Sequence, residues 1–232
     1  MSLRAIAVDE AAGNLPAADR IGVADVTREL RARIASHAIP PGARLREWEV
    51  ATEFEIPRLS AREALERLVH LGFVDRQPNR GIVVRRRELT EVLHLFDLRE
   101  VNEGLCARLA ASNVSPESWR DLVELFGAPM EAIVERKDLH AYVENYEVLR
   151  HRLIEAASSP PLTDLLQWLY DMTDIFVRRV LLVSDRAYHG LRDHRTVLAA
   201  LHSGDADAAE RLRRRTVVNI RAAVERYGSF VL

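Results

Sequence analysis

Cysteine and long apolar runs are scarce in this 232-residue chain, and each scarcity excludes a class of protein. A single cysteine, Cys106, cannot form an internal disulfide or supply a zinc cluster of thiolates. No uncharged stretch approaches the ~20 apolar residues that a membrane-spanning helix needs. The opening residues MSLRAIAVDEAAG hold no long apolar core, so no signal peptide is expected. We therefore expect a cytoplasmic protein that makes no use of a membrane.

The charge is unevenly distributed along the chain. The formal net charge is −2, which argues against a protein that coats nucleic acid without selectivity. Residues 23–88 nevertheless carry 13 arginines against 10 acidic residues, whereas residues 89–232 carry 18 basic against 22 acidic residues. A basic N-terminal third on an acidic remainder fits a small nucleic-acid module joined to a second unit.

Residues 23–88 show the pattern of three helices followed by a hairpin, after a flexible arm expected over residues 1–22. Apolar residues at helical spacing predict a helix from Val23, and Pro40-Pro41-Gly42 must end it. Further helices are expected over about 47–54 and 59–71. Short β-type runs at 73–74 and 82–84 flank a segment suited to a tight turn. This is the plan of a winged helix-turn-helix, whose third helix enters the major groove of DNA.

No strand pattern remains after Leu89, and the rest of the chain reads as helices. Ser115, Asp138 and Asp205 stand at expected helix starts, and Ser115 precedes a proline at the first helical position. An antiparallel bundle of this length can enclose its own core and a cavity. The predicted helices cover residues 89–112, 116–136, 138–157, 161–183, 185–202 and 205–227, so the fold class is mainly α, with a bundle of six or seven helices over residues 89–232.

Several fixed spacings resemble a known family. The segment IPPGARLREWEVATEFEIPRLSAREALERLVHLGFVDRQPNRGIVV contains P-G-x-x-L, R-x-x-x-R-E-A-L, L-x-x-x-G-F-V and N-R-G. It resembles the DNA-binding domain of GntR-type bacterial transcription regulators. The later segments LFDLREVNEGLCARLAA, HRLIEAASSPPL and DHRTVLAALHSGDADAAERLRRR are similar to the FCD-type effector domain of the FadR subfamily. Together these resemblances cover roughly residues 23–227.

The resemblance implies a set of DNA-binding residues. Arg58 and Arg62 match the arginines of the recognition-helix region, and guanidinium groups suit guanine edges or phosphates. Pro57 stands where the family usually has a capping serine or threonine, so Ser60 is expected to cap a helix that begins slightly later. The other residues expected to contact DNA are Arg44, Arg46, Ser60, Arg80 and Gly81.

The resemblance also implies a metal site in the bundle. Glu147 and His151 are four residues apart, and His194 and Thr216 flank a helix-helix turn at similar distances. Metal-binding members of the subfamily carry Asp-x-x-x-His and two later histidines at these places, and Thr216 replaces the last one. Two imidazoles and a carboxylate can still hold Zn, Ni or Mn. The alternative is that His151 and His194 direct an organic effector without any metal.

Three further residues are candidates for effector binding. Arg99 could clamp a carboxylate, unless it forms an ion pair with Glu103, and Asn219 could donate to a ligand. We expect a homodimer that binds palindromic operator DNA, acts as a repressor and responds to a small organic, sugar or amino acid. Two alternatives remain: a DNA-binding protein whose bundle only dimerises, and a metal-dependent hydrolase using Glu147, His151 and His194.

Overall fold

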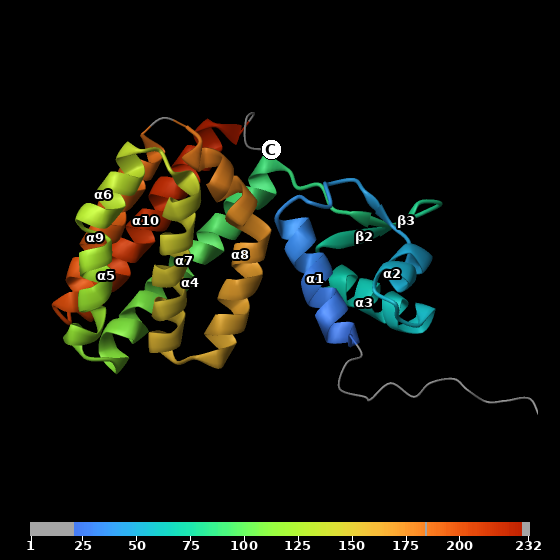
Figure 1. Cartoon of the computed structure of the whole chain (residues 1–232), viewed down its shortest axis with the longest axis horizontal. Coiled ribbons are helices and arrows are strands. Elements are labelled where there is room, and N and C mark those ends of the chain that lie inside the picture. The colour runs from blue at the N-terminus through green and yellow to red at the C-terminus, as the bar shows by residue number, and fades with distance from the viewer. Residues whose placement is uncertain (1–20, 184, 229–232) are drawn as a thin grey trace, which may run out of the picture.

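The structure, a computed structural model, describes residues 21–183 and 185–228 and has two parts (Figure 1). The N-terminal part, here called the head, contains three helices and a small sheet. Nearly all of the predicted arm over residues 1–22 lies outside the described residues. The elements of the head are α1 (Val23–Ala35), β1 (Arg44–Leu45), α2 (Glu47–Glu53), α3 (Arg58–His70), β2 (Val74–Gln77) and β3 (Gly81–Val84).

The sheet of the head is antiparallel, with β3 between β1 and β2. Gln77 pairs with Gly81 next to the hairpin tip, and Arg44 pairs with Val83 on the other side of β3. The hairpin formed by β2 and β3 was predicted. The two-residue strand β1 was not, because a strand of that length has no alternating pattern to detect. The winged helix-turn-helix fold is therefore confirmed, with one added edge strand.

The second part, here called the bundle, is entirely helical in the residues that the structure describes. Asp138 and Asp205 cap two of its helices: their carboxylates accept hydrogen bonds from Ala141 N–H at 3.0 Å and Ala208 N–H at 2.9 Å. The elements are α4 (Leu89–Asn113), the 3-10 helix η1 (Pro116–Trp119), α5 (Arg120–Leu125), α6 (Ala128–Glu135), α7 (Leu139–Ala157), α8 (Pro160–Leu181), α9 (Arg186–His202) and α10 (Ala206–Arg226).

The single helix predicted over 116–136 is wrong. The segment forms η1, α5 and α6 instead, with Gly127 between the last two. Pro129 lies in the first turn of α6, where its missing N–H costs no hydrogen bond, but it could not stand within a continuous helix. Ser115 does precede η1, but its hydroxyl lies 3.2 Å from the Ser118 hydroxyl and caps no backbone N–H.

The predicted start of the recognition helix is also wrong. Helix α3 begins at Arg58 with Pro57 as its N-cap, so Ser60 lies in the first turn and does not cap it. Pro57 adopts φ −57° and ψ 144°, the extended conformation of an N-cap, and its carbonyl accepts from Ala61 N–H at 3.1 Å. The ring fixes φ near this value, which is why proline can start the helix without a capping side chain.

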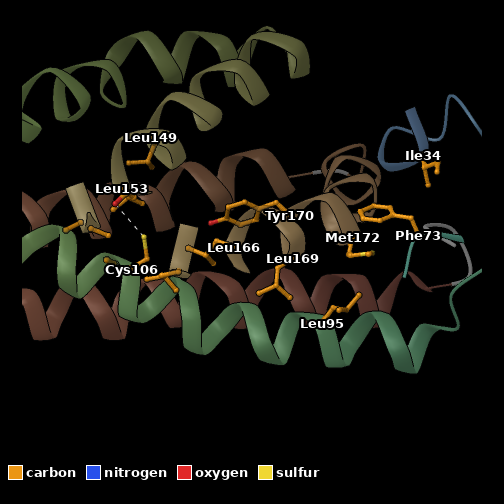
Figure 2. Packing of buried hydrophobic residues seen from close by; sticks show 14 of the residues in the cluster. Ile34, Phe73, Leu95, Cys106, Leu149, Leu153, Leu166, Leu169, Tyr170 and Met172 are labelled. Carbon is orange, nitrogen blue, oxygen red and sulfur yellow. Dashed lines mark hydrogen bonds between the residues drawn. The ribbon is translucent and has the colours of Figure 1, made fainter. Parts of the chain in front are cut away.

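One apolar core runs through the bundle and into the head. Figure 2 shows Ile34 and Phe73 of the head beside Met172 of α8, and all three belong to the same buried cluster as Cys106 and Leu153. Burial raises the pKa of the Cys106 thiol to about 12, so it stays protonated at neutral pH. Among the described residues, no helix is long and apolar enough to cross a membrane.

Candidate DNA-binding surface and buried bundle site

The recognition helix presents two exposed arginines on one face. Arg58 is the first residue of α3, and Arg62 follows one turn later with 62% of its side chain exposed. The nearest acid to Arg62 is Glu47 on α2, whose Oε1 lies 4.0 Å from Arg62 Nε. An exposed pair at this distance contributes little, so the guanidinium is available to a ligand.

The N-terminus of α3 adds backbone donors to this face. No side chain of the described residues caps it, and the first hydrogen bond within the helix is donated by Ala61. The N–H groups of the first turn therefore remain available, and a helix N-terminus with free N–H groups attracts anions such as phosphate. Leu59, 76% exposed, lies between the two arginines in the sequence and is available for apolar contact.

The tip of the β2–β3 hairpin, or wing, carries a further basic side chain. Asn79 and Gly81 both have positive φ, at 62° and 75°, and Arg80 between them is exposed. The guanidinium of Arg44 lies across Gly81, 3.7 Å from where a Cβ would stand. Arg46 forms an ion pair with Glu49 at 2.7 Å. The structure thus brings Arg44, Arg80 and Gly81 together at the wing, whereas Arg46 is the N-cap residue of α2.

A buried ionic cluster lies at the centre of the bundle. Arg99 Nε donates to Glu103 Oε1 at 2.7 Å, and Arg213 Nη2 lies 2.5 Å from Glu103 Oε2. All three side chains are essentially inaccessible to solvent. Burial alone raises the pKa of Glu103, but attraction to Arg213 and Arg99 outweighs it and holds the pKa below its usual value. The carboxylate is therefore charged, and it neutralises one of two buried arginines.

A third arginine joins the same cluster through aromatic rings. Arg150 donates to both Asp174 oxygens, at 3.0 and 2.9 Å, and its guanidinium lies 3.9 Å from the centre of the Tyr170 ring. Arg213 donates to the Tyr146 hydroxyl at 3.1 Å. Cations above aromatic faces are stabilised by the ring quadrupole, which partly replaces lost hydration. The cluster is thus rich in arginine.

A narrow pocket lies beside this cluster. His194 stacks on Tyr146 with 4.8 Å between ring centres, and its buried Nδ1 has no hydrogen-bond partner among the described residues. Burial, Arg213 and Arg186 all lower the pKa of His194 far below its ordinary value, so the ring is neutral. The cavity measures about 20 Å³ and is lined by Tyr142, Tyr146, Val177, Val180, Leu181, Arg186, Gly190, His194, Thr216 and Ile220.

The structure does not bring the predicted metal ligands together. His194 and Thr216 do line one pocket, as their spacing predicts. His151 is exposed, with Nδ1 2.8 Å from the Glu147 carbonyl, and the Glu147 carboxylate pairs with Arg150 at 2.5 Å. Within residues 21–183 and 185–228, no three histidine, cysteine or acidic residues form a group that could hold a metal. These positions therefore do not fit a divalent ion.

The cause is the rotation of α7 about its axis. Each residue turns a helix by about 100°, so the positions next to Glu147 and His151 are the ones that face inward. These are Tyr146 and Arg150, both buried. The signal was present in the sequence, because Tyr142, Tyr146, Leu149 and Leu153 form the apolar stripe of this helix and Arg150 lies within it.

The predicted effector residues lie near the pocket without lining it. Arg99 and Glu103 bind each other, which is the alternative that the sequence left open, and Arg99 also donates to the Thr173 hydroxyl at 2.7 Å. Asn219 donates to Asp193 at 2.9 Å. The arginine that lines the pocket is Arg186, which no sequence motif singled out.

Comparisons with known proteins agree with this division of the chain. The family described as "Bacterial regulatory proteins, gntR family" matches residues 23–84, and the family described as "FCD domain" matches residues 94–219. A similar relative is the HTH-type transcriptional repressor RspR of Escherichia coli strain K12, 30% identical over 190 residues that span 80% of this chain and 81% of the relative.

Solved structures show the same fold. Escherichia coli McbR/YncC superposes with a TM-score of 0.69 at 20% identity, covering 88% of this chain and 98% of that one. A transcriptional regulator GntR from Rhodococcus sp. RHA1 superposes with a TM-score of 0.62 at 22% identity, covering 88% of this chain and 97% of that one. The winged head, the helical bundle and the two family matches together show that this chain belongs to the GntR family of transcription regulators and carries an FCD domain.

Proposed function

We propose that this regulator binds double-stranded operator DNA as a homodimer and represses transcription. We further propose that a small carboxylate effector in the pocket beside His194 changes its affinity for the operator. The observation that carries the proposal is the exposed pair Arg58 and Arg62 on α3, in a chain whose bundle holds a pocket lined by His194, whose buried Nδ1 has no hydrogen-bond partner among the described residues. The proposal involves no metal.

The geometry of the head supports the proposed DNA contacts. Arg58 and Arg62 share the face of α3 that can enter a major groove, where a guanidinium can bind a guanine edge with two hydrogen bonds. The free N–H groups at the start of the helix suit a phosphate. Arg80 at the wing tip and Arg44 beside it are placed to hold the neighbouring backbone.

The pocket chemistry favours an anionic effector. Arg186 supplies a cation, and His194, whose buried Nδ1 has no hydrogen-bond partner among the described residues, lines the same pocket. A cavity of about 20 Å³ holds roughly one water molecule. A carboxylic acid must therefore push the lining helices apart, and its binding energy is coupled to the position of those helices.

Helix α8 is the element that links the pocket to the head. Val177, Val180 and Leu181 line the pocket. On its other side, the Trp168 indole donates to the Leu71 carbonyl at 2.9 Å, and Asp171 pairs with Arg31 of α1. Figure 1 shows α8 between the rest of the bundle and the head. A shift of α8 on effector binding would therefore change how the head sits on the bundle.

The proposed dimer would use α4. Leu98, Val101 and Leu105 are each at least 42% exposed and follow one another at helical spacing. Val218 of α10, 43% exposed, extends the apolar surface onto the helix packed against α4. A second copy would bury this face and position two recognition helices on one palindrome. Leu105→Glu should shift the molecular mass measured by light scattering from dimer to monomer; a dimeric L105E would exclude this interface.

DNA recognition is tested with a duplex selected in vitro by the wild-type protein. Replacing both Arg58 and Arg62 by alanine should weaken binding by ~1–3 kcal/mol for each arginine that contacts a base. For each arginine that contacts a phosphate, the slope of log binding constant against log salt concentration should become smaller by about 1. Arg67→Ala on the same helix, where Arg67 pairs with Glu63, is the matched control. Unchanged affinity and salt dependence in the double variant would refute the proposed recognition surface.

The effector is tested by thermal shift with a panel of carboxylic acids, with and without Zn or Ni. The wild type should be stabilised by an acid alone, whereas Val177→Phe, which fills the pocket, should not respond. Val148→Phe, at an exposed position of α7, is the control. No response to any acid would leave the bundle as a dimerisation scaffold, and a response that requires metal would contradict the metal-free pocket.

A further inference from the structure

A larger cavity, distinct from the effector pocket, lies between the head and the bundle. It measures about 250 Å³ and is bounded by the end of α1, the linker after β3 and one face of α8. Ile34, Phe73, Met172, Ile175 and Phe176 give it an apolar wall. Four of these side chains belong to the two buried clusters, and Figure 2 shows Ile34, Phe73 and Met172 near one another at this junction.

The cavity is also lined by basic side chains. Three consecutive arginines, Arg85, Arg86 and Arg87, line it. Arg85 and Arg87 share one carboxylate, Glu91, at 3.1 and 2.5 Å. Arg86 is exposed, and within the described part of the chain no carboxylate lies within ion-pair distance of it. Its guanidinium crosses Gly42, 3.0 Å from where a Cβ would stand.

The acids of the cavity leave a positive balance. Asp171 is paired with Arg31, and the exposed Glu88 stands at the start of α4. When Arg31 and Glu91 are counted with the lining residues, the cavity has four arginines and three carboxylates, which gives a net positive charge. His37 contributes no charge, because burial and the nearby Arg179 lower its pKa. Its Nδ1 lies 3.0 Å from Arg179 Nη2.

We propose that this cavity is a second ligand site, for a compact amphipathic anion with an apolar body and one acidic group. The apolar body would rest on Phe73, Met172 and Phe176, and the acidic group would bind Arg86 at the rim. Pockets of a few hundred Å³ with apolar walls and one charged anchor are typical small-molecule sites. Because the ligand would touch the head and α8 together, its binding is linked to their relative position. The site does not depend on the effector pocket beside His194.

The fluorescent probe anilinonaphthalenesulfonate, an aromatic sulfonate, tests the proposal on the full-length folded protein. The wild type should bind it saturably with one probe per chain. Ala35 lines the cavity, so Ala35→Phe should fill it and abolish binding, whereas Ala32→Phe at an exposed position one turn earlier should not. Arg86→Ala removes an exposed cation and should weaken binding about tenfold without unfolding the chain.

Val177→Phe, which fills the effector pocket, should bind the probe like the wild type. Thermal unfolding of each variant shows whether it is folded. If Ala35→Phe does not fold, Arg86→Ala still tests the proposal. Equal binding by wild type, Ala35→Phe and Arg86→Ala would overturn the proposal. So would loss of binding in Val177→Phe alone, which would place the probe in the effector pocket.

Discussion

Arg31 of α1 and Asp171 of α8 form an ion pair across the boundary between the head and the bundle. Both side chains are mostly buried, at 23% and 17% exposure, and Asp171 also accepts from Gln167 at 3.1 Å. Burial raises the pKa of Asp171, and Arg31 opposes that effect. Three residues later on the same helix, Asp174 binds Arg150 inside the bundle. Adjacent turns of α8 thus form ion pairs with the head, through Asp171, and with the rest of the bundle, through Asp174.

Removing the Arg31–Asp171 ion pair should weaken the packing of the head against the bundle. Asp171→Asn removes the partner of a mostly buried arginine, which we expect to cost ~1–2 kcal/mol of local stability at this boundary. The linker arginines Arg85–Arg87 should then be cleaved by trypsin roughly tenfold faster, because cleavage follows the population of the open form. Mass spectrometry of the fragments measures this rate. Asp164→Asn, at an exposed position of α8, is the control, and equal rates in both variants would contradict the prediction.

The ionic cluster should be highly sensitive to loss of its central carboxylate. Glu103→Gln leaves Arg99 and Arg213 buried without their shared counter-charge, and removal of one partner from a buried ion pair typically costs about 3–5 kcal/mol. Urea unfolding should show this loss. Glu225→Gln, which removes an exposed acid paired with Arg221, should cost less than about 1 kcal/mol. A Glu103→Gln variant as stable as Glu225→Gln would show that the cluster is not needed for folding.

The stability of the protein should fall below neutral pH because of His194. Its folded pKa is far below the ordinary value of 6.5, so under acidic conditions the unfolded chain takes up a proton that the folded chain does not. This contribution to stability is complete above pH 6.5. It is lost as the pH falls below that value, by at most ~1.4 kcal/mol per pH unit. The free energy of unfolding should therefore fall less between pH 7 and pH 5 in His194→Gln than in the wild type. An equal fall in both proteins would refute the assignment.

The pocket wall depends on a glycine. A Cβ at Gly190 would lie 2.4 Å from the Tyr142 hydroxyl, so α9 can approach α7 only without a side chain there. Gly190→Ala should destabilise the protein by ~1–3 kcal/mol through this clash. In a Tyr142→Phe background the clash disappears, and the same substitution should become neutral or stabilising by up to ~1 kcal/mol, the helix preference of alanine over glycine. Additive effects of the two changes in chemical denaturation would contradict the proposed contact.

Much of the fold could be predicted from local patterns. Asp138 began a helix where expected, because a capping carboxylate acts on the adjacent backbone. Pro40-Pro41-Gly42 excluded any continuation of the first helix, which had already ended at Ala35. Where local rules conflicted, the prediction failed. Proline replaced the usual cap before α3, and glycine and proline interrupted the segment expected as one helix between Ser115 and Asp138.

The sequence by itself determined the order of the helices, the wing and the arginine pair on α3, because these depend on spacings within one element and on motifs of fixed length. The apolar stripe of α7 also indicated which face of that helix turns inward, yet the metal hypothesis placed Glu147 and His151 where Tyr146 and Arg150 lie. That rotation is set by packing of α7 against helices distant in the sequence, where burying Tyr146 and Leu149 outweighs every local preference. Tertiary structure alone also decided that Arg99 would bind Glu103, and that α8 would join the pocket to the head.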